Sequence, residues 1–138
     1  MVIGWKPAAQ AHLAVEGAAV WLRRAKRVSA VMVAQDPERG WSEAIERLAR
    51  QLGVDLTLVL IEPNDDGVDV QLLQATHKQG ANAAVLGAYQ HTEVVEWVVP
   101  STTRFMLAHA DLPLFYGALI GLRVWSLLVA RRAGTIPA

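Results

Sequence analysis

The sequence contains no cysteine. Disulfide bonds and cysteine-based catalysis are therefore excluded, and the absence fits a reducing compartment. Neither sign of charge is in excess, because thirteen Lys and Arg side chains balance thirteen Asp and Glu side chains. No net electric field therefore attracts nucleic acid or an anionic membrane to this chain.

Long hydrophobic runs are also missing. The longest apolar stretch, residues 117–130, is interrupted by Arg123 and falls short of the ~20 residues that a membrane-spanning helix needs. No charged-then-apolar signal sequence opens the chain. With 138 residues, 53% of them hydrophobic, we expect one globular domain in the cytoplasm and no membrane partner.

What the sequence does contain is a regular alternation of short apolar runs with segments of helical periodicity. This alternation predicts an α/β fold in which helices cover both faces of a five-stranded parallel sheet. The runs predict strands near residues 2–5, 28–34, 56–61, 83–86 and 112–116. The segments between them predict helices near residues 8–24, 37–52, 68–80 and 101–110.

Individual residues refine these elements. Gly53 stands where a left-handed cap would end the second helix. The strand at residues 56–61 is apolar almost throughout, which is typical of a strand covered on both faces. In the first helix, the spacing places four residues on one face that we expect to be buried: Leu13, Gly17, Val20 and Trp21.

One strand and the helix after it form a candidate binding motif. The apolar strand at residues 83–86 runs into Gly87, and Ser101 opens the helix that follows. A glycine turn beside a helix N-terminus can hold a phosphate, because backbone N–H groups and the helix dipole both favour an anion there. However, Gln90 and Pro100 occupy two positions where such a loop would favour glycine.

These residues resemble the universal stress protein family. Residues 80–92 (GANAAVLGAYQHT) and 101–114 (STTRFMLAHADLPL) are similar to the C-terminal half of its domain. The opening VIGWKP and the LRRA at residues 22–25 also resemble it, especially the second domains of bacterial tandem forms. The likeness covers residues 2–116. It implies a flavodoxin-like sheet with strand order 3-2-1-4-5, as in adenine nucleotide alpha hydrolases, and commonly a homodimer formed through the last strand.

Members of that family that bind ATP carry an acidic residue after the first strand and a glycine-rich phosphate loop. Carried over to this sequence, the acidic residue becomes Lys6, which can only donate hydrogen bonds. Gln90 brings a Cβ where glycine would let the backbone approach a phosphate, and Pro100 removes an N–H donor. The resemblance therefore implies a degenerate nucleotide or anion site whose candidate residues are Lys6, Gly87, Gln90, His91, Ser101 and Thr102.

Two alternatives stay open at this site. Lys6 can instead contact a phosphate, which would leave weak affinity for ATP or AMP. His91 is either a loop-packing residue or a phosphate contact. The other histidines share no metal-ligand spacing, so we expect no metal site, and we find no nucleophile–base pair that would make the chain an enzyme.

Residues 117–138 extend beyond the stress-protein-like domain at residues 1–116. This extension is apolar on nearly all sides, which indicates burial on the domain or against a partner. We expect residues 112–130 to supply a homodimer interface next to an unpaired edge strand. The sequence as a whole predicts a non-enzymatic stress-response module that acts through an unknown protein partner; the alternative is a nucleotide-dependent switch that binds ATP or AMP.

Overall fold

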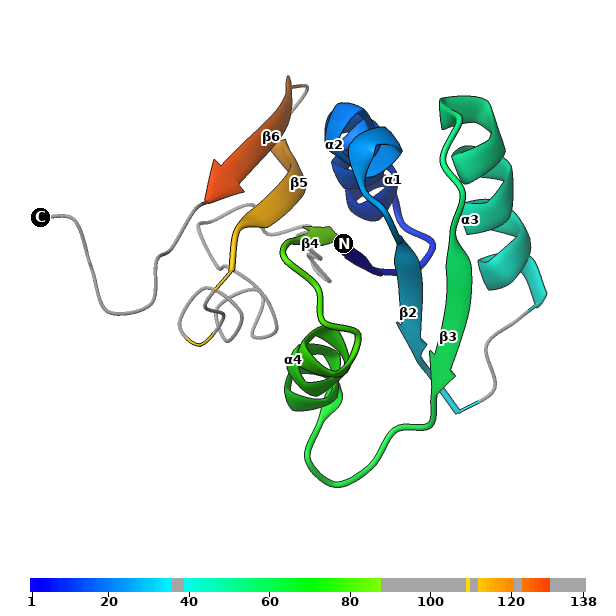
Figure 1. The fold of residues 1–138 in the computed structure, drawn as a ribbon, viewed down its shortest axis with the longest axis vertical. Coiled ribbons are helices and arrows are strands. Elements are labelled where there is room, and N and C mark those ends of the chain that lie inside the picture. Colours follow the sequence, from blue (N-terminus) through cyan, green and yellow to red (C-terminus); the bar gives the residue numbers. More distant parts are fainter. Residues whose placement is uncertain (36–38, 88–108, 110–111, 121–122, 130–138) are drawn as a thin grey trace, which may run out of the picture.

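The structure is a computed structural model that describes residues 1–35, 39–87, 109, 112–120 and 123–129. One sheet of six strands has the order β3-β2-β1-β4-β5-β6 (Figure 1). The strands are β1 (Val2–Gly4), β2 (Ser29–Val33), β3 (Thr57–Ile61), β4 (Ala84–Gly87), β5 (Leu114–Ile120) and β6 (Arg123–Val129). The helices are α1 (Ala9–Gly17), α2 (Ala19–Arg24), α3 (Arg39–Leu52) and α4 (Val68–Lys78).

The first five strands are parallel, which confirms the predicted fold class and the strand order 3-2-1-4-5. The central strand β1 pairs with β2 on one side and β4 on the other, so that Ile3 lies opposite both Ala30 and Val85. No helix in the described part of the chain is long and apolar enough to cross a bilayer.

The helices form a layer on each face of the sheet (Figure 1). Helices α1, α2 and α3 cover one face, where sheet residues such as Ile3 and Met32 pack against Val15, Leu22 and Ile45. Helix α4 covers the other face, where Leu72 and Ala75 pack against residues of four strands: Val2, Val31, Ala84, Leu86 and Leu114. Successive strand residues therefore enter different cores, as the two-residue repeat of a strand requires.

The first helical segment differs from its prediction. It is divided into α1 and α2 at Ala18, and its buried face consists mainly of small residues: Ala11, Ala14, Val15, Ala18, Ala19 and Leu22. Val20 and Trp21, which we expected on the buried face, are 46% and 50% exposed. The small side chains let the helix axis lie close to the sheet, and this close packing outweighs the larger apolar area that Val20 and Trp21 offer.

Helix α3 ends, and helix α4 begins, largely where the sequence predicts. Gly53 has φ +70° and ends α3 with a bond from the N–H of Val54 to the carbonyl of Ala49, 2.8 Å long. Gly67, with φ +92°, precedes α4 in a turn where the N–H of Asp66 donates to Oδ1 of Asn64 at 2.9 Å. Both glycines adopt backbone angles that side chains disfavour.

The strand β3 is less buried than its apolar sequence predicts. It lies at one end of the sheet, and Leu60 is 55% exposed. The expectation that both faces are covered was wrong because an apolar run does not reveal whether a strand is central or at an edge.

The C-terminal end of the sheet also differs from the sequence prediction. The boundary expected after residue 116 lies inside β5, which continues to Ile120. β6 then pairs antiparallel with β5 from Ile120↔Arg123 to Leu114↔Val129. The edge of β5 that we expected to be unpaired is therefore occupied by β6, which is the last strand on this side among the described residues.

Candidate functional site

The carboxyl ends of β1 and β4 meet at the point where the chain changes direction in the sheet. From β1 the chain proceeds to β2 on one side, and from β3 it returns to β4 on the other. Ligands of open α/β sheets bind at such switch points. Gly4 lies opposite Leu86, so that Lys6, which follows β1, and Gly87, which ends β4, belong to the same edge of the sheet.

The structure describes only part of the predicted site. Lys6 is exposed just beyond β1. Gly87 lies opposite Gly117 of β5. The remaining candidates lie outside the described residues: Gln90, His91, Ser101 and Thr102, together with Pro100.

Trp5 lies next to Lys6 and is fixed at both its backbone and its ring. Its backbone N–H donates to the carbonyl of Val31 at 2.8 Å, which extends the β1–β2 ladder. Its indole Nε1 donates to the carbonyl of Trp41 in α3 at 2.9 Å, and the side chain is only 4% exposed. Because a buried indole needs a partner for its N–H, this bond determines the orientation of the ring.

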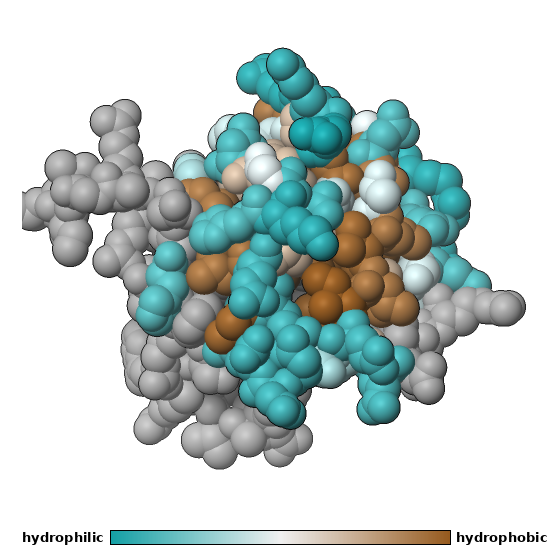
Figure 2. Space-filling view, turned by 60° about the horizontal axis from the view of Figure 1, so that its bottom comes forward, coloured by the Kyte–Doolittle hydropathy of each residue, from teal (hydrophilic) through white to brown (hydrophobic). Residues whose placement is uncertain are grey.

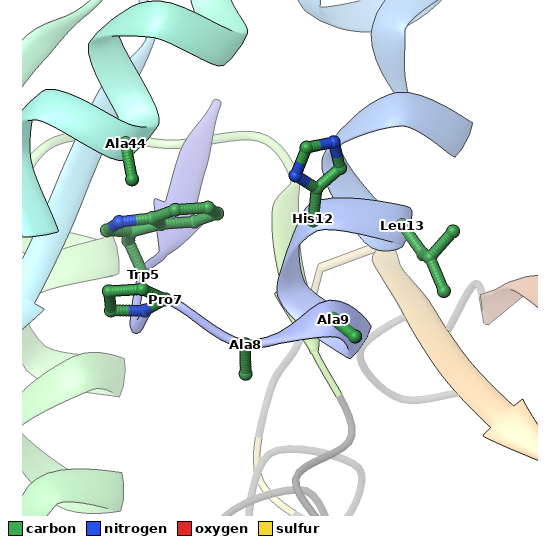
Figure 3. A pocket seen from close by; sticks show the side chains of 7 residues that line it. All are labelled: Trp5, Pro7, Ala8, Ala9, His12, Leu13 and Ala44. Carbon is green, nitrogen blue, oxygen red and sulfur yellow. The ribbon is translucent and has the colours of Figure 1, made fainter.

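A hollow of about 460 Å³ opens beside this indole (Figure 3). Its wall comes from the end of β1, the start of α1 and one turn of α3: Trp5, Pro7, Ala8, Ala9, His12, Leu13 and Ala44. In Figure 3 the imidazole of His12 lies across the hollow from the indole of Trp5. The indole N–H is already bonded to Trp41, so among the described residues of this wall the imidazole of His12 is the side chain that can present a polar atom to a ligand.

His12 is itself engaged with a carboxylate on its own helix. Its Nε2 lies 2.8 Å from Oε1 of Glu16, one turn further along α1, and both side chains are about half exposed. A pair at this spacing in water contributes little to stability. The hollow therefore offers apolar walls and one imidazole, a composition that suits an apolar or aromatic group better than a sugar or a phosphate.

Sequence reasoning did not find this hollow. The sequence places Trp5 at the end of the first predicted strand and His12 among histidines without metal-ligand spacing, and neither observation indicates a hollow. The available signal was a tryptophan directly after the first strand, followed by Pro7 and Ala8, whose short side chains leave space at the carboxyl end of the sheet.

The acidic loop before α4 has a structural role. Asp69 accepts a bond from the N–H of Val70 at 2.9 Å, as a helix-start residue does. The side chain of Gln71 bonds to both the N–H of Asn64 and the carbonyl of Glu62, at 3.1 and 2.8 Å. Among the described residues, no group of three or more His, Cys, Asp or Glu is placed to hold a metal ion.

Solved structures with the same architecture include universal stress proteins. One from Archaeoglobus fulgidus superposes with a TM-score of 0.64 and 18% sequence identity, over 82% of this chain and 92% of that chain. UspA from Lactobacillus plantarum gives 0.60 and 14%, over 82% and 93%. The chain has the universal stress protein fold.

A second universal stress protein from Archaeoglobus fulgidus is a longer chain with the same fold. It matches with a TM-score of 0.63 and 12% identity over 96% of this chain, but over only 44% of its own length. No family model matches the sequence, and no curated protein matches it. At identities this low, the universal stress protein fold is what the comparisons establish, and function has to be argued from the residues of this chain.

Proposed function

We propose that the chain is a non-enzymatic, stress-protein-like module of the cytoplasm that acts through a protein partner and has a degenerate nucleotide pocket. The observation that carries the proposal is the chemistry at the end of β1. Lys6 stands where the family resemblance places an acidic residue, and the hollow beside it is lined by apolar side chains. An ammonium group cannot accept the hydrogen bonds of ribose hydroxyls or an adenine amino group.

Thermal unfolding of the full chain with and without millimolar Mg-ATP tests this proposal. We expect little change in Tm, because a ligand stabilises only in proportion to its binding to the folded state. The chain with Lys6→Asp, Gln90→Gly and Pro100→Gly should gain a concentration-dependent increase in Tm. The same changes with Lys26→Asp in place of Lys6→Asp are the control, since Lys26 is an exposed lysine outside the candidate site. Saturation of the unmodified chain at low micromolar ATP would contradict the proposal.

A nucleotide-dependent switch is the second candidate, and one observation favours it. Lys6 follows β1 and Gly87 ends the neighbouring parallel strand β4, so an ammonium group and a glycine backbone belong to the same edge of the sheet. A lysine at such a place can bind a phosphate as a point charge. On this alternative, ATP or AMP raises the Tm of the unmodified chain and Lys6→Ala abolishes the increase, whereas the degenerate pocket predicts no response in either.

The proposal also includes self-association as a homodimer in which the C-terminal hairpin of β5 and β6 supplies the contact. The motive is that an edge strand presents unpaired backbone groups to any chain that can pair with them.

An assay for phosphate release from ATP, run on the samples used for thermal unfolding, tests whether the chain is non-enzymatic. We expect the rate to equal that of buffer, and turnover that persists through purification would contradict it.

A further inference from the structure

The sequence segments that contain the two terminal strands carry charges of opposite sign, although the chain as a whole is neutral. No Lys or Arg stands between Arg50 and Lys78, the stretch that contains β3 and α4. Its acidic residues are Asp55, Glu62, Asp65, Asp66 and Asp69. From Leu112 onward the sequence has no acidic residue, and its charges are those of Arg123, Arg131 and Arg132. One terminal strand is therefore flanked by carboxylates, and the other belongs to a purely basic segment.

Strand β3 presents backbone groups along its outer side that pair with no described strand. The N–H of Thr57 donates to Val28, and the carbonyl of Ile61 accepts from Ala34, so these groups point toward β2. Because the direction alternates along a strand, the N–H and carbonyl groups of Leu58 and Leu60 point away from the sheet. No described strand lies beyond them.

The surface beside this edge is apolar. Among the described residues Leu60 is the most exposed large apolar side chain, at 55%, and Val68 at the start of α4 is 46% exposed. Figure 2, in which the lower part of the Figure 1 view is turned toward the reader, shows apolar surface between polar side chains. The strand itself, TLVLI, carries none of the charges or prolines with which proteins protect an edge from pairing.

The outer side of β6 has a similar row of backbone groups. The carbonyl of Pro113 accepts a hydrogen bond from the N–H of Ala84 in β4. Because the direction alternates along a strand, the N–H and carbonyl groups of Leu114 and of every second residue after it point the other way, toward β6. Their partners in the register of the hairpin are Arg123, Trp125, Leu127 and Val129, whose groups point back toward β5. The groups of the residues between them, Val124, Ser126 and Leu128, point away from the sheet.

We propose that β3 of one copy pairs with β6 of a second copy, so that the sheet continues from one chain into the next. This inference rests on the self-association proposed above and names the two surfaces involved. When both copies have the same orientation, β6 runs antiparallel to β3. Arg123, the first residue of β6, then lies at the same end of the contact as Glu62, the first residue after β3.

Charge favours this pairing over two-fold alternatives. Pairing of β6 with another β6 brings two basic segments together, and pairing of β3 with β3 brings two acidic segments together. Like charges placed opposite each other on paired strands are destabilising, and opposite charges are stabilising. The contact is short, so we expect weak association, detectable at protein concentrations of about 100 μM. Because it is head-to-tail, each contact leaves one β3 and one β6 unpaired, and the homodimer is the first step of a concentration-dependent series.

Sedimentation velocity of the full chain with two proline variants tests the pairing. Leu60→Pro removes an outward N–H of β3, and Ser126→Pro removes an outward N–H of β6, without touching a bond inside the sheet. We expect the unmodified chain to grow beyond a dimer with concentration and each variant alone to remain monomeric. An equimolar mixture should form a heterodimer and nothing larger, because one variant supplies β6 and the other β3.

Each other outcome overturns a defined part of the inference. A Leu60→Pro chain that associates like the unmodified chain indicates pairing of β6 with β6 and overturns the contact with β3. A Ser126→Pro chain that associates like the unmodified chain overturns the contact with β6. An unmodified chain that is monomeric at about 100 μM overturns self-association itself, while the Mg-ATP titration still decides the nucleotide part of the proposed function.

Charge reversal provides a second test that does not depend on tolerance of proline. Glu62→Arg and Arg123→Glu should each lower the association constant by about three- to tenfold, as expected when attraction between nearby exposed charges is replaced by repulsion. The two changes in one chain should restore it. Glu16→Arg, which changes the charge equally on α1, is the matched control and should have little effect. Two reversals that simply add would contradict the placement of these two residues at the same end of the contact.

Discussion

The two faces of the sheet are held by different kinds of interaction. On the face covered by α1, α2 and α3, the core consists of aliphatic and aromatic side chains. On the α4 face, apolar packing is joined by the buried polar side chains that the structure describes: Ser29, Gln71 and Thr76. The stability of the first face therefore depends on filling space, whereas that of the second depends also on the geometry of hydrogen bonds.

The polar contacts of the α4 face have a consequence for the loop before this helix. Thr76 bonds to the carbonyl of Leu72 within α4 at 2.7 Å, and Ser29 bonds to Gln79 just beyond it at 3.2 Å. Gln71 holds the loop at Glu62 and Asn64. Among the described residues, no buried side-chain nitrogen or oxygen lacks a partner. The α4 face, whose stability depends also on hydrogen bonds, is thus the one that positions the acidic loop after β3.

The largest effect should come from a cavity on the apolar face. Ile45 is fully buried between α3 and the sheet, so Ile45→Ala should lower the free energy of unfolding by about 2–5 kcal/mol. Urea denaturation followed by circular dichroism measures this. Val20→Ala, at a site that is 46% exposed on α2, is the control and should cost less than about 0.5 kcal/mol. A similar small loss at Ile45 would show that this face is not held by packing.

A smaller effect is expected from overfilling the α4 face. A Cβ on Gly4 would lie 2.5 Å from Cδ2 of Leu86 and 3.0 Å from Cδ2 of Leu72, both of which are buried. Gly4→Ala should therefore destabilise the fold by about 1–3 kcal/mol. Leu86→Ala removes the closest atom, so the cost of Gly4→Ala should be much smaller in that background. A double-mutant cycle without coupling between the two positions would contradict this account.

The hydrogen bonds of the α4 face are tested by Gln71→Leu, which keeps the approximate size of the side chain and removes both of its bonds to the loop. We expect a loss of about 1–2 kcal/mol, because the N–H of Asn64 and the carbonyl of Glu62 lose their partner. Gln74→Leu, at an exposed position of the same helix, is the matched control. Hydrogen exchange at the Asn64 amide should become faster in the first variant and stay unchanged in the second.

The smallest effect is expected from Trp5→Phe on the apolar face. The change keeps an aromatic ring but removes the bond from Nε1 to the carbonyl of Trp41, which should cost about 1 kcal/mol. Thermal unfolding of this variant beside Trp21→Phe gives the comparison, since the ring of the half-exposed Trp21 packs against Phe115, with the ring centroids 5.2 Å apart, and its indole N–H has no hydrogen bond among the described residues. Equal losses in the two variants would show that the indole bond does not fix the wall of the hollow.

Much of the fold could be predicted because its signals are local. Gly53 and Gly67 end and precede helices at positive φ, and strands β2 and β4 are apolar runs between such markers. The face of the first helical segment could not be predicted in the same way. Val20 and Trp21 are larger than Ala14 and Ala18, yet the alanines are buried because only small residues fit the close approach to the sheet.

For the predicted nucleotide or anion site, the structure places two residues, and its other candidates stay a prediction. Lys6 and Gly87 are predicted at the ends of two strands, and the parallel pairing of β1 with β4 brings those ends to one edge. The hollow depends on a bond between Trp5 and Trp41, which are far apart in the sequence. No local pattern indicates that a carbonyl of α3 would receive the indole N–H, because this requires the crossover connection to return α3 to the same face as α1.

The sequence by itself determined the alternation of strands and helices, the parallel sheet of five strands and the neutral balance of charge. Tertiary structure decided the rest. The apolar residues of β6 have no period that distinguishes helix from strand, and it is the open edge of β5 that makes them a strand by offering backbone partners. The strand order also placed β3, with the acidic residues near it in the sequence, and β6, with Arg123, at opposite edges, because the separation of strands in space depends on which strands neighbour each other and not on their order along the chain.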